Sequence, residues 1–161
     1  MVKSWRARLE GDGKTSQLGP IPPRMERKHG PGTMVVPNGP EVEAMVACIP
    51  ERRIATSIDL AEAIALSHNT TIACPATTSI YMWIVAHASE ESPSPLGEIP
   101  FWRALKVNAE LNENYPGGIE RQRVQLEAEG HAIVQKGRRF YVVDYQKALI
   151  NPAELVQRSP S

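Results

Sequence analysis

Apolar residues recur at helical spacing in three segments of the chain. In residues 40–49 they stand at positions i, i+3, i+4 and i+7 between two prolines, which is typical of an amphipathic helix. A second pattern follows Thr56 or Ser57, either of which can cap a helix, and it ends near residues 68–69. The third segment, about residues 74–91, is apolar nearly all round at its centre, so we expect it to be mostly buried.

The C-terminal third predicts one more helix and a β-hairpin. Gly117-Gly118 begins a helical segment that ends at Gly130, a position suited to a left-handed cap. Apolar residues at 131–135 and 140–143 flank Lys136-Gly137-Arg138-Arg139, which predicts a hairpin with three cations at its tip. With the two preceding helices joined by a short turn, the pattern predicts an α+β fold. We expect a winged-helix-like helix-turn-helix domain, mostly helical, with a short C-terminal β-hairpin as its wing.

The chain divides into three parts by composition. Residues 1–32 are rich in Gly, Pro and charge and show no sustained period, so we expect a basic arm that is extended or partly disordered. Residues 33–145 form the domain, and its first segment, 33–37, is either a short strand or a stretch pinned to the domain. Residues 146–161 are interpreted as a marginal tail, with a turn of helix packed on the domain as the alternative.

Charge is balanced overall but uneven along the chain. The 161 residues hold 18 basic and 18 acidic side chains, so a strongly basic chain, the simplest indication of nucleic-acid binding, is excluded. Residues 1–30 hold seven basic and three acidic groups, residues 31–100 hold two and eight, and residues 101–161 hold nine and seven. An anion-binding face must therefore draw on the arm and the C-terminal third.

Several classes of protein find no support in the sequence. The two cysteines, Cys48 and Cys74, form neither a metal-ligand spacing nor a disulfide framework, and the four histidines are scattered. No apolar run approaches a membrane span, and no secretory segment follows the start. We expect a cytoplasmic monomer with no cofactor, no metal and no membrane partner.

Four short motifs together resemble a known family. They are Cys74-Pro75-x-Thr77-Thr78, Pro100-Phe101-Trp102-Arg103, Tyr115-Pro-Gly-Gly-Ile-Glu120 and Glu129-Gly130. Over about residues 33–135 the chain resembles the O6-alkylguanine-DNA alkyltransferases and their alkyltransferase-like relatives, which carry Pro-Cys-His-Arg or Pro-Trp-His-Arg followed by a Gly-Gly helix ending in Glu-Gly. The resemblance implies the fold of that DNA-binding domain and contact with DNA.

In the same alignment, the residues that carry out alkyl transfer in the family are replaced by others. The family's acceptor Cys falls on Phe101 and its His on Trp102, and neither side chain can act as nucleophile or base. Arg103 and Glu129 match the family and, without their partners, are expected to brace the core. Cys74, at a helix N-terminus, is the alternative nucleophile, although a capping role is commoner. We therefore predict that the chain is not an enzyme.

The two residues that flip the base in the family are also replaced here. In the family an Arg of the recognition helix fills the space that the flipped base leaves and a Tyr turns the phosphate, and the alignment places these on Ser79 and Ser57. Tyr81 or Met82 is the alternative wedge, although aromatic residues at helical spacing are more often part of a core. We expect Phe101, Trp102, Glu129 and Tyr81 to mark the former pocket.

Duplex DNA is the partner that the resemblance implies, in a role linked to repair or transcription. The candidate DNA contacts share a donor group or a cation, and they are Thr77, Thr78, Ser79, Arg103, Lys106, Lys136, Arg138 and Arg139. The alternative is a winged-helix protein-interaction module with no DNA role, because the net charge is zero, residues 59–98 are acidic and fold alone does not fix function.

Overall fold

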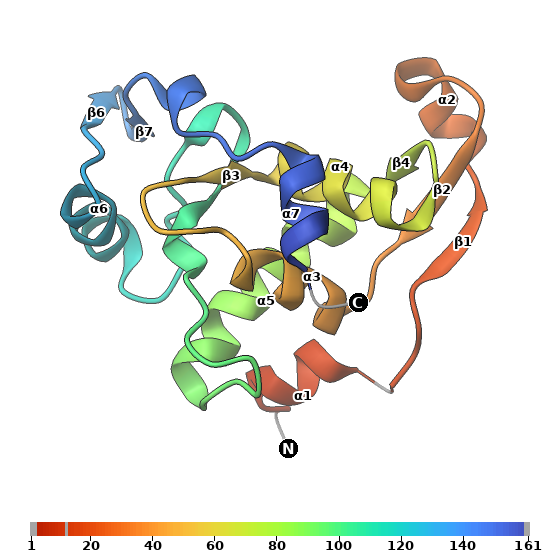
Figure 1. Cartoon of the computed structure of the whole chain (residues 1–161), viewed down its shortest axis with the longest axis horizontal. Helices are drawn as coiled ribbons and strands as arrows, with labels where there is room; N and C mark the ends of the chain where they lie inside the picture. Colours follow the sequence, from red (N-terminus) through yellow and green to blue (C-terminus); the bar gives the residue numbers. More distant parts are fainter. Residues whose placement is uncertain (1–2, 12, 160–161) are drawn as a thin grey trace.

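Seven α-helices and three small β-sheets make up residues 3–11 and 13–159, the part of the chain that the computed structural model describes (Figure 1). The α-helices are α1 (Trp5–Glu10), α2 (Pro23–His29), α3 (Gly39–Ala47), α4 (Ser57–His68), α5 (Pro75–Glu91), α6 (Gly118–Ala128) and α7 (Pro152–Arg158). Three short 3-10 helices are η1 (Phe101–Arg103), η2 (Val107–Ala109) and η3 (Tyr145–Lys147). The fold is mixed α+β. None of the helices described here is long and apolar enough to span a membrane.

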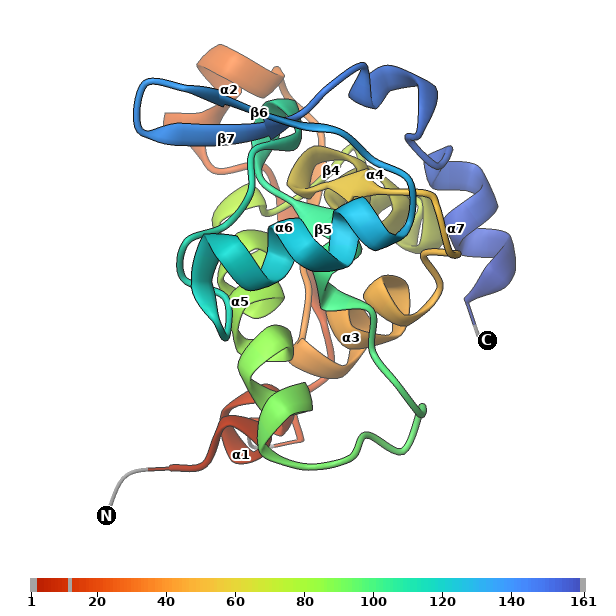
Figure 2. The same ribbon diagram turned by 90° about the vertical axis from the view of Figure 1, so that its left-hand side faces the viewer.

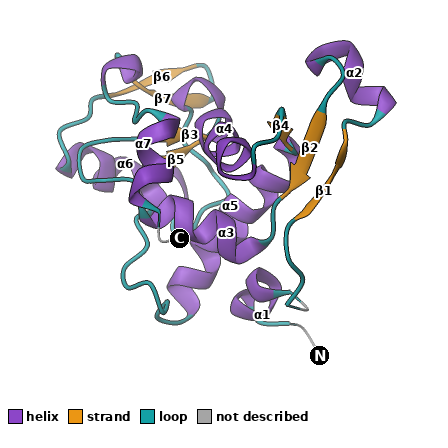
Figure 3. Ribbon diagram, turned by 45° about the vertical axis from the view of Figure 1, so that its right-hand side comes forward, coloured by secondary structure: helices purple, strands orange, loops and turns teal. Residues whose placement is uncertain are grey.

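The strands are short and form three separate sheets. They are β1 (Gln17–Pro20), β2 (Thr33–Val36), β3 (Ala55–Thr56), β4 (Ile72–Ala73), β5 (Ala104–Leu105), β6 (Ile133–Lys136) and β7 (Arg139–Val142). The order in the first sheet is β1-β2-β4, with β1 antiparallel and β4 parallel to β2. β3 pairs in parallel with β5, and β6 and β7 form the C-terminal hairpin (Figure 3).

Local signals begin and end the helices where the sequence predicts them. The Thr56 hydroxyl accepts from the backbone N–H of Asp59, and the Asp59 carboxylate accepts from that of Thr56, so a capping box begins α4. Pro75 is the first residue of α5, where its missing N–H costs no hydrogen bond. The helices predicted at 40–49, from 56–57, at 74–91 and from 117–118 are confirmed to within about two residues.

The main core gathers around α5. Helices α1, α3 and α4 pack against α5, and α7 packs against α4. Val85 of α5, Ile64 of α4 and Val42 of α3 are fully buried in this cluster. A second cluster joins α6, β5 and β7 through Leu126, Leu105 and other apolar residues. The tail joins the main core as well, because Leu155 of α7 is fully buried there.

The expectation of an extended or disordered arm over residues 1–32 is wrong for the residues described here. They form α1, β1 and α2, and the Leu9 side chain is 1% exposed in the main core. The Glu91 carboxylate accepts from the backbone N–H groups of Trp5 and Arg6, which caps α1 from the far end of α5. The error has a physical reason, since the partners that order this segment lie far away in sequence. The proposed boundaries at 32/33 and 145/146 stay predictions.

Candidate nucleic-acid interface

Phe101 stands in η1 at the position that the resemblance gives to an acceptor cysteine, and it is buried. Its side chain is 3% exposed and packs with Ala86 of α5 and with Tyr115. The Tyr115 ring meets Phe101 edge-on at 5.6 Å between ring centroids, and its hydroxyl donates to the carbonyl oxygen of Ala104 at 2.9 Å. Burial raises the pKa of Tyr115 well above its usual range. Aromatic rings therefore occupy the space around this position.

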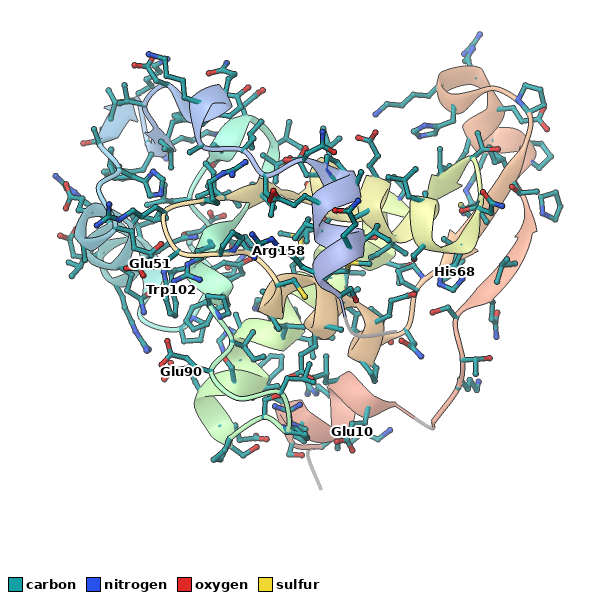
Figure 4. All side chains as sticks on the ribbon, in the orientation of Figure 1. Glu10, Glu51, His68, Glu90, Trp102 and Arg158 are labelled. Carbon is teal, nitrogen blue, oxygen red and sulfur yellow. The ribbon has the colours of Figure 1, made fainter. Side chains whose placement is uncertain are left out.

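Trp102 and Glu129 form a bonded pair beside Phe101. The indole N–H of Trp102 donates to the Glu129 carboxylate at 3.0 Å, and the Arg103 guanidinium donates to the same carboxylate from Nε and from a terminal nitrogen. The backbone N–H of Arg52 donates to it as well. Figure 4 shows Trp102 between α6 and the end of α5 that bears Glu90.

The pKa of Glu129 reflects this enclosure. Burial raises the pKa of Glu129, but the bonds from Arg103, Trp102 and the Arg52 backbone outweigh burial and hold it below its ordinary value. The Glu129 carboxylate is therefore charged at neutral pH and accepts hydrogen bonds from all three of these residues. Arg103 also donates to the carbonyl oxygen of Ile49, so this ion pair ties η1, α6 and the end of α3 together.

The structure brings together three of the four predicted pocket residues. Phe101, Trp102 and Glu129 are neighbours, whereas Tyr81 lies against the main core cluster. Tyr81 does not line the hollow beside Phe101 and Trp102. This hollow of about 350 Å³ is closed on one side by the Arg121–Glu90 ion pair.

Three hollows lie on the surface between α2 and the hairpin, and we name them together the trough. The first, about 710 Å³, lies between α2, α4 and the start of α5. The second, about 260 Å³, shares Ser57, Ser79 and Val107 with the first and also meets Lys106 and Glu110. The third, about 680 Å³, is lined by Asn108, which follows Val107 in the sequence, and by hairpin residues that include Lys136 and Tyr141.

The floor of the trough carries backbone strain and apolar side chains. Asn108, which lines the third hollow, and the buried Ala109 next to it have left-handed φ angles of 63° and 60°. Asparagine adopts this conformation readily, whereas for alanine it costs free energy, and such strain concentrates at functional sites. Ile58 and Val107 line the trough with more than a third of their surface exposed. The trough therefore combines exposed apolar groups with a constrained loop.

The three polar residues in the first turns of α5 differ in availability. Ser79 is exposed and lines the trough, as does Ser57 of α4. Thr77 is half-buried and donates to Sγ of Cys74, and Thr78 is fully buried and donates to the Cys74 carbonyl oxygen. Arg103 is likewise committed to Glu129 and Ile49. Thr78 and Arg103 therefore form hydrogen bonds inside the protein, and we remove them from the candidate interface.

The hairpin presents its cations to solvent. Lys136 pairs with Arg139 in register, and Gly137 and Arg138 form the two-residue turn, in which Gly137 has a φ of 66°. A glycine at the first turn position suits a tight hairpin turn. Arg139 lies 3.9 Å from Glu110 and remains mostly exposed, and Lys136 lies over the Tyr141 ring at 5.7 Å.

Lys106 is less free than the hairpin cations. Its ammonium lies 3.5 Å from Glu110 and 3.4 Å from Glu113. It therefore remains in the trough wall with its charge partly compensated.

The cysteines lie elsewhere. Cys74 is the N-cap residue of α5, and Cys48 follows α3, where burial raises the pKa of its thiol against a smaller lowering by Arg158. Both are half-buried. Among the residues that the structure describes, no group of three or more potential metal ligands occurs.

The basic arm was expected to contribute to an anion-binding face, but the helix that carries its cations, α2, was not predicted. Arg24, Arg27 and Lys28 are exposed on α2, and Lys28 lines the first hollow. Pro22-Pro23 at the start of a charged run, followed by Gly30, was the available signal for a short helix, but nothing in the sequence gave its position beside α4 and α5.

The fold is similar to that of solved alkyltransferase-like structures. Two solved structures of this class match: S. pombe Atl1 in complex with damaged DNA containing O6-carboxymethylguanine, and S. pombe ATL in complex with DNA. Each is 18% identical in sequence with a TM-score of 0.50, and each alignment covers 70% of this chain and 94% of the other. Neither a family model nor a curated protein matches this sequence. The likeness supports the fold expected from the motifs.

Proposed function

We propose that this chain is a DNA-binding protein of the alkyltransferase-like type that does not transfer alkyl groups. The observation that carries the proposal is the trough, which runs from the start of α5 to a cationic hairpin on a fold whose similar structures were solved with DNA. On this proposal α4 and α5 are the helix-turn-helix, the β6–β7 hairpin is the wing, and the partner is duplex DNA.

Several contacts in the structure support sequence-tolerant binding. Ser57 and Ser79 offer the trough only short hydroxyl groups, and among the described residues α5 carries no cation. Lys136, Arg138 and Arg139 are exposed on the hairpin and supply phosphate contacts. Such contacts position a duplex without reading its sequence. A role linked to DNA repair or transcription, for a monomer in the cytoplasm, belongs to the same proposal.

The absence of alkyl transfer follows from side-chain chemistry. An acceptor must be a thiolate that attacks the alkyl carbon, and Phe101 has no such atom. The carboxylate that would orient a base is instead bonded to the Trp102 indole N–H, which neither gives nor takes a proton near neutral pH. Incubation with a duplex containing O6-methylguanine should leave the lesion and the protein mass unchanged, with an active alkyltransferase as the positive control.

The decisive experiment is fluorescence anisotropy of a labelled duplex, with and without one O6-methylguanine, titrated with the whole chain at low and at moderate salt. Equal binding that weakens steeply with salt supports a general DNA-binding protein. Tighter binding to the modified duplex shows that the site still receives a flipped base. No binding at either salt refutes the proposal.

A protein-interaction module remains the second candidate, because the trough exposes apolar side chains. Ile58 and Val107 are each about half exposed there. Apolar groups in a surface groove pack well against a partner helix, but they make no favourable contact with a phosphate backbone. If the anisotropy titration shows no binding, this candidate takes its place.

A further inference from the structure

Helix α2 projects from the same side of the molecule as the hairpin. Figure 1 shows α2 at the upper right and β6–β7 at the upper left, with α4 between them, and both stay at the upper side in Figures 2 and 3. Because these views differ only by turns about the vertical axis, the shared height is real. Lys28 of α2 lines the first hollow and Lys136 of the hairpin lines the third, so the two elements stand at opposite ends of the trough.

The base of α2 is built into the fold. Strands β1 and β2, which precede and follow it, pair over four residues from Gln17↔Val36 to Pro20↔Thr33. Ile21 is 2% exposed, and its N–H donates to the carbonyl oxygen of Gly32 at 2.9 Å. α2 is thus carried on a paired two-strand stem whose outer sheet partner, β4, immediately precedes α5. This stem fixes α2 relative to the start of α5.

The charges of α2 are uncompensated. Arg24, Arg27 and Lys28 are exposed, and Glu26 is the one acid of the helix. Among the described residues, none of these three cations lies within 4 Å of a carboxylate, whereas Arg121, Arg123 and Arg158 all do. A cluster of unpaired cations on a short projecting helix repels itself and gains most from a polyanion.

One side of α2 faces the trough. Lys28 and His29 line the 710 Å³ hollow opposite Ala61 and Ile58 of α4 and Ala76 of α5. Lys136 of the hairpin lines the third hollow, at the other end of the trough. Two separated cationic ends with an apolar floor match a long anion of uniform charge better than a compact ligand, which would contact only one end.

We propose that α2 is a second phosphate-binding element, which contacts the backbone of the same DNA duplex that the hairpin binds. The inference rests on the proposed DNA-binding function. It adds a second DNA-contacting surface, which lies on the N-terminal segment. Arg24, Arg27 and Lys28 supply the contacts as charged donors, and the β1–β2 stem holds them in place. The duplex is thereby held at both ends of the trough.

The test compares matched triple variants of the whole chain. R24A/R27A/K28A removes the α2 cations, and R8A/R123A/R158A removes the same charge from α1, α6 and α7, away from the trough. Affinity for an unmodified labelled duplex is measured by anisotropy over a series of salt concentrations. Circular dichroism and thermal unfolding verify that both variants keep the fold, as the exposure of the α2 cations leads one to expect.

The α2 variant should bind about tenfold or more weakly at moderate salt, and the slope of log Kd against log salt should fall by about 2–3, because each phosphate contact contributes about 0.9. The control variant should keep the wild-type slope. Equal loss in both variants would mean that only net charge matters and would overturn the inference. Unchanged binding by the α2 variant would overturn it while leaving the proposed function intact. A wild-type chain that binds no duplex would overturn both.

Discussion

The indole N–H of Trp102 donates to Oε2 of Glu129 at 3.0 Å, on a carboxylate that Arg103 also binds at 2.8 Å. The resemblance to alkyltransferases places a histidine at Trp102, where it would prepare a thiolate at Phe101. Indole keeps its proton near neutral pH, so the same geometry here becomes a structural brace between η1 and α6. The Glu129 carboxylate is therefore bonded to an indole N–H at the position where the resemblance places a histidine.

Replacing Glu129 by Gln should destabilise the fold. The Glu129 side chain is 9% exposed, and E129Q weakens bonds to a buried guanidinium, so we expect a loss of about 2–3 kcal/mol in the free energy of unfolding. Urea denaturation at pH 7 measures it. E127Q, which removes an exposed carboxylate two residues earlier on α6, should change stability by less than about 0.5 kcal/mol. Equal effects of the two variants would contradict the brace.

The stability difference between wild type and E129Q should depend on pH. The folded-state pKa of Glu129 lies below its ordinary value, so its charge stabilises the fold fully above the unfolded pKa of about 4.3. The contribution is lost as the pH falls through the lower folded-state pKa. Denaturation at pH 7, 5 and 3 should therefore show the wild-type advantage constant from 7 to 5 and smaller at 3. An advantage that grows on acidification would contradict the assignment.

Restoring a thiol at Phe101 should not restore alkyl transfer. In F101C the sulfur would lie among Ala86, Tyr115 and Trp102, and the Trp102 indole, at the position of the family's histidine, cannot accept its proton. The smaller side chain should also cost about 2–3 kcal/mol of stability. Mass spectrometry after incubation with an O6-methylguanine duplex should show no added methyl group. Methylation at position 101 would mean that the pocket still prepares a nucleophile.

Truncating Leu9 should destabilise the whole domain, because α1 is part of the main core. Leu9 is 1% exposed, and L9A should cost about 3 kcal/mol in urea denaturation. L18A is the control from the same N-terminal segment, since Leu18 is 59% exposed and should be nearly neutral. A neutral L9A would mean that the segment does not pack as described.

The helices and the hairpin were predicted from local sequence signals. The Thr56 capping box, the proline that starts α5, the glycines around α6 and the hairpin turn at Gly137 each depend on residues within four positions of one another. Such contacts leave a pattern in the sequence itself. The helices and the hairpin were therefore predictable, and the buried α5 followed from its apolar surface.

Contacts between distant residues explain what the sequence left out. α1 is capped by Glu91, 86 residues away from Trp5, and Tyr115 meets Phe101 across a loop. Arg103 matches a family motif, but its bond to the Ile49 carbonyl oxygen, 54 residues away, turns an expected DNA contact into an internal one. No periodicity within one segment encodes such pairings, so the placement of α2 beside the trough had to come from the fold.

The hairpin variant K136A/R138A/R139A should lower affinity for all duplexes alike. These cations are exposed, so their removal spares the fold, and the slope of log Kd against log salt should fall by about 2–3. Combined with R24A/R27A/K28A, the losses in binding free energy should add, because no described contact joins the two clusters. Anisotropy on two unrelated sequences measures both. Affinity unchanged by the hairpin variant would refute the wing contact.

Glu62 offers a test of opposite sign, because it is an exposed carboxylate in the wall of the trough. A duplex in the trough brings phosphates towards this charge, so E62Q should raise affinity about two- to threefold at low salt and less at moderate salt. E120Q removes an exposed carboxylate from α6, outside the trough, and should have no comparable effect. A gain in binding cannot arise from partial unfolding, which would lower affinity. If E62Q and E120Q bind equally, the duplex does not pass between α2 and α4, and contact with DNA would have to be confined to the hairpin end.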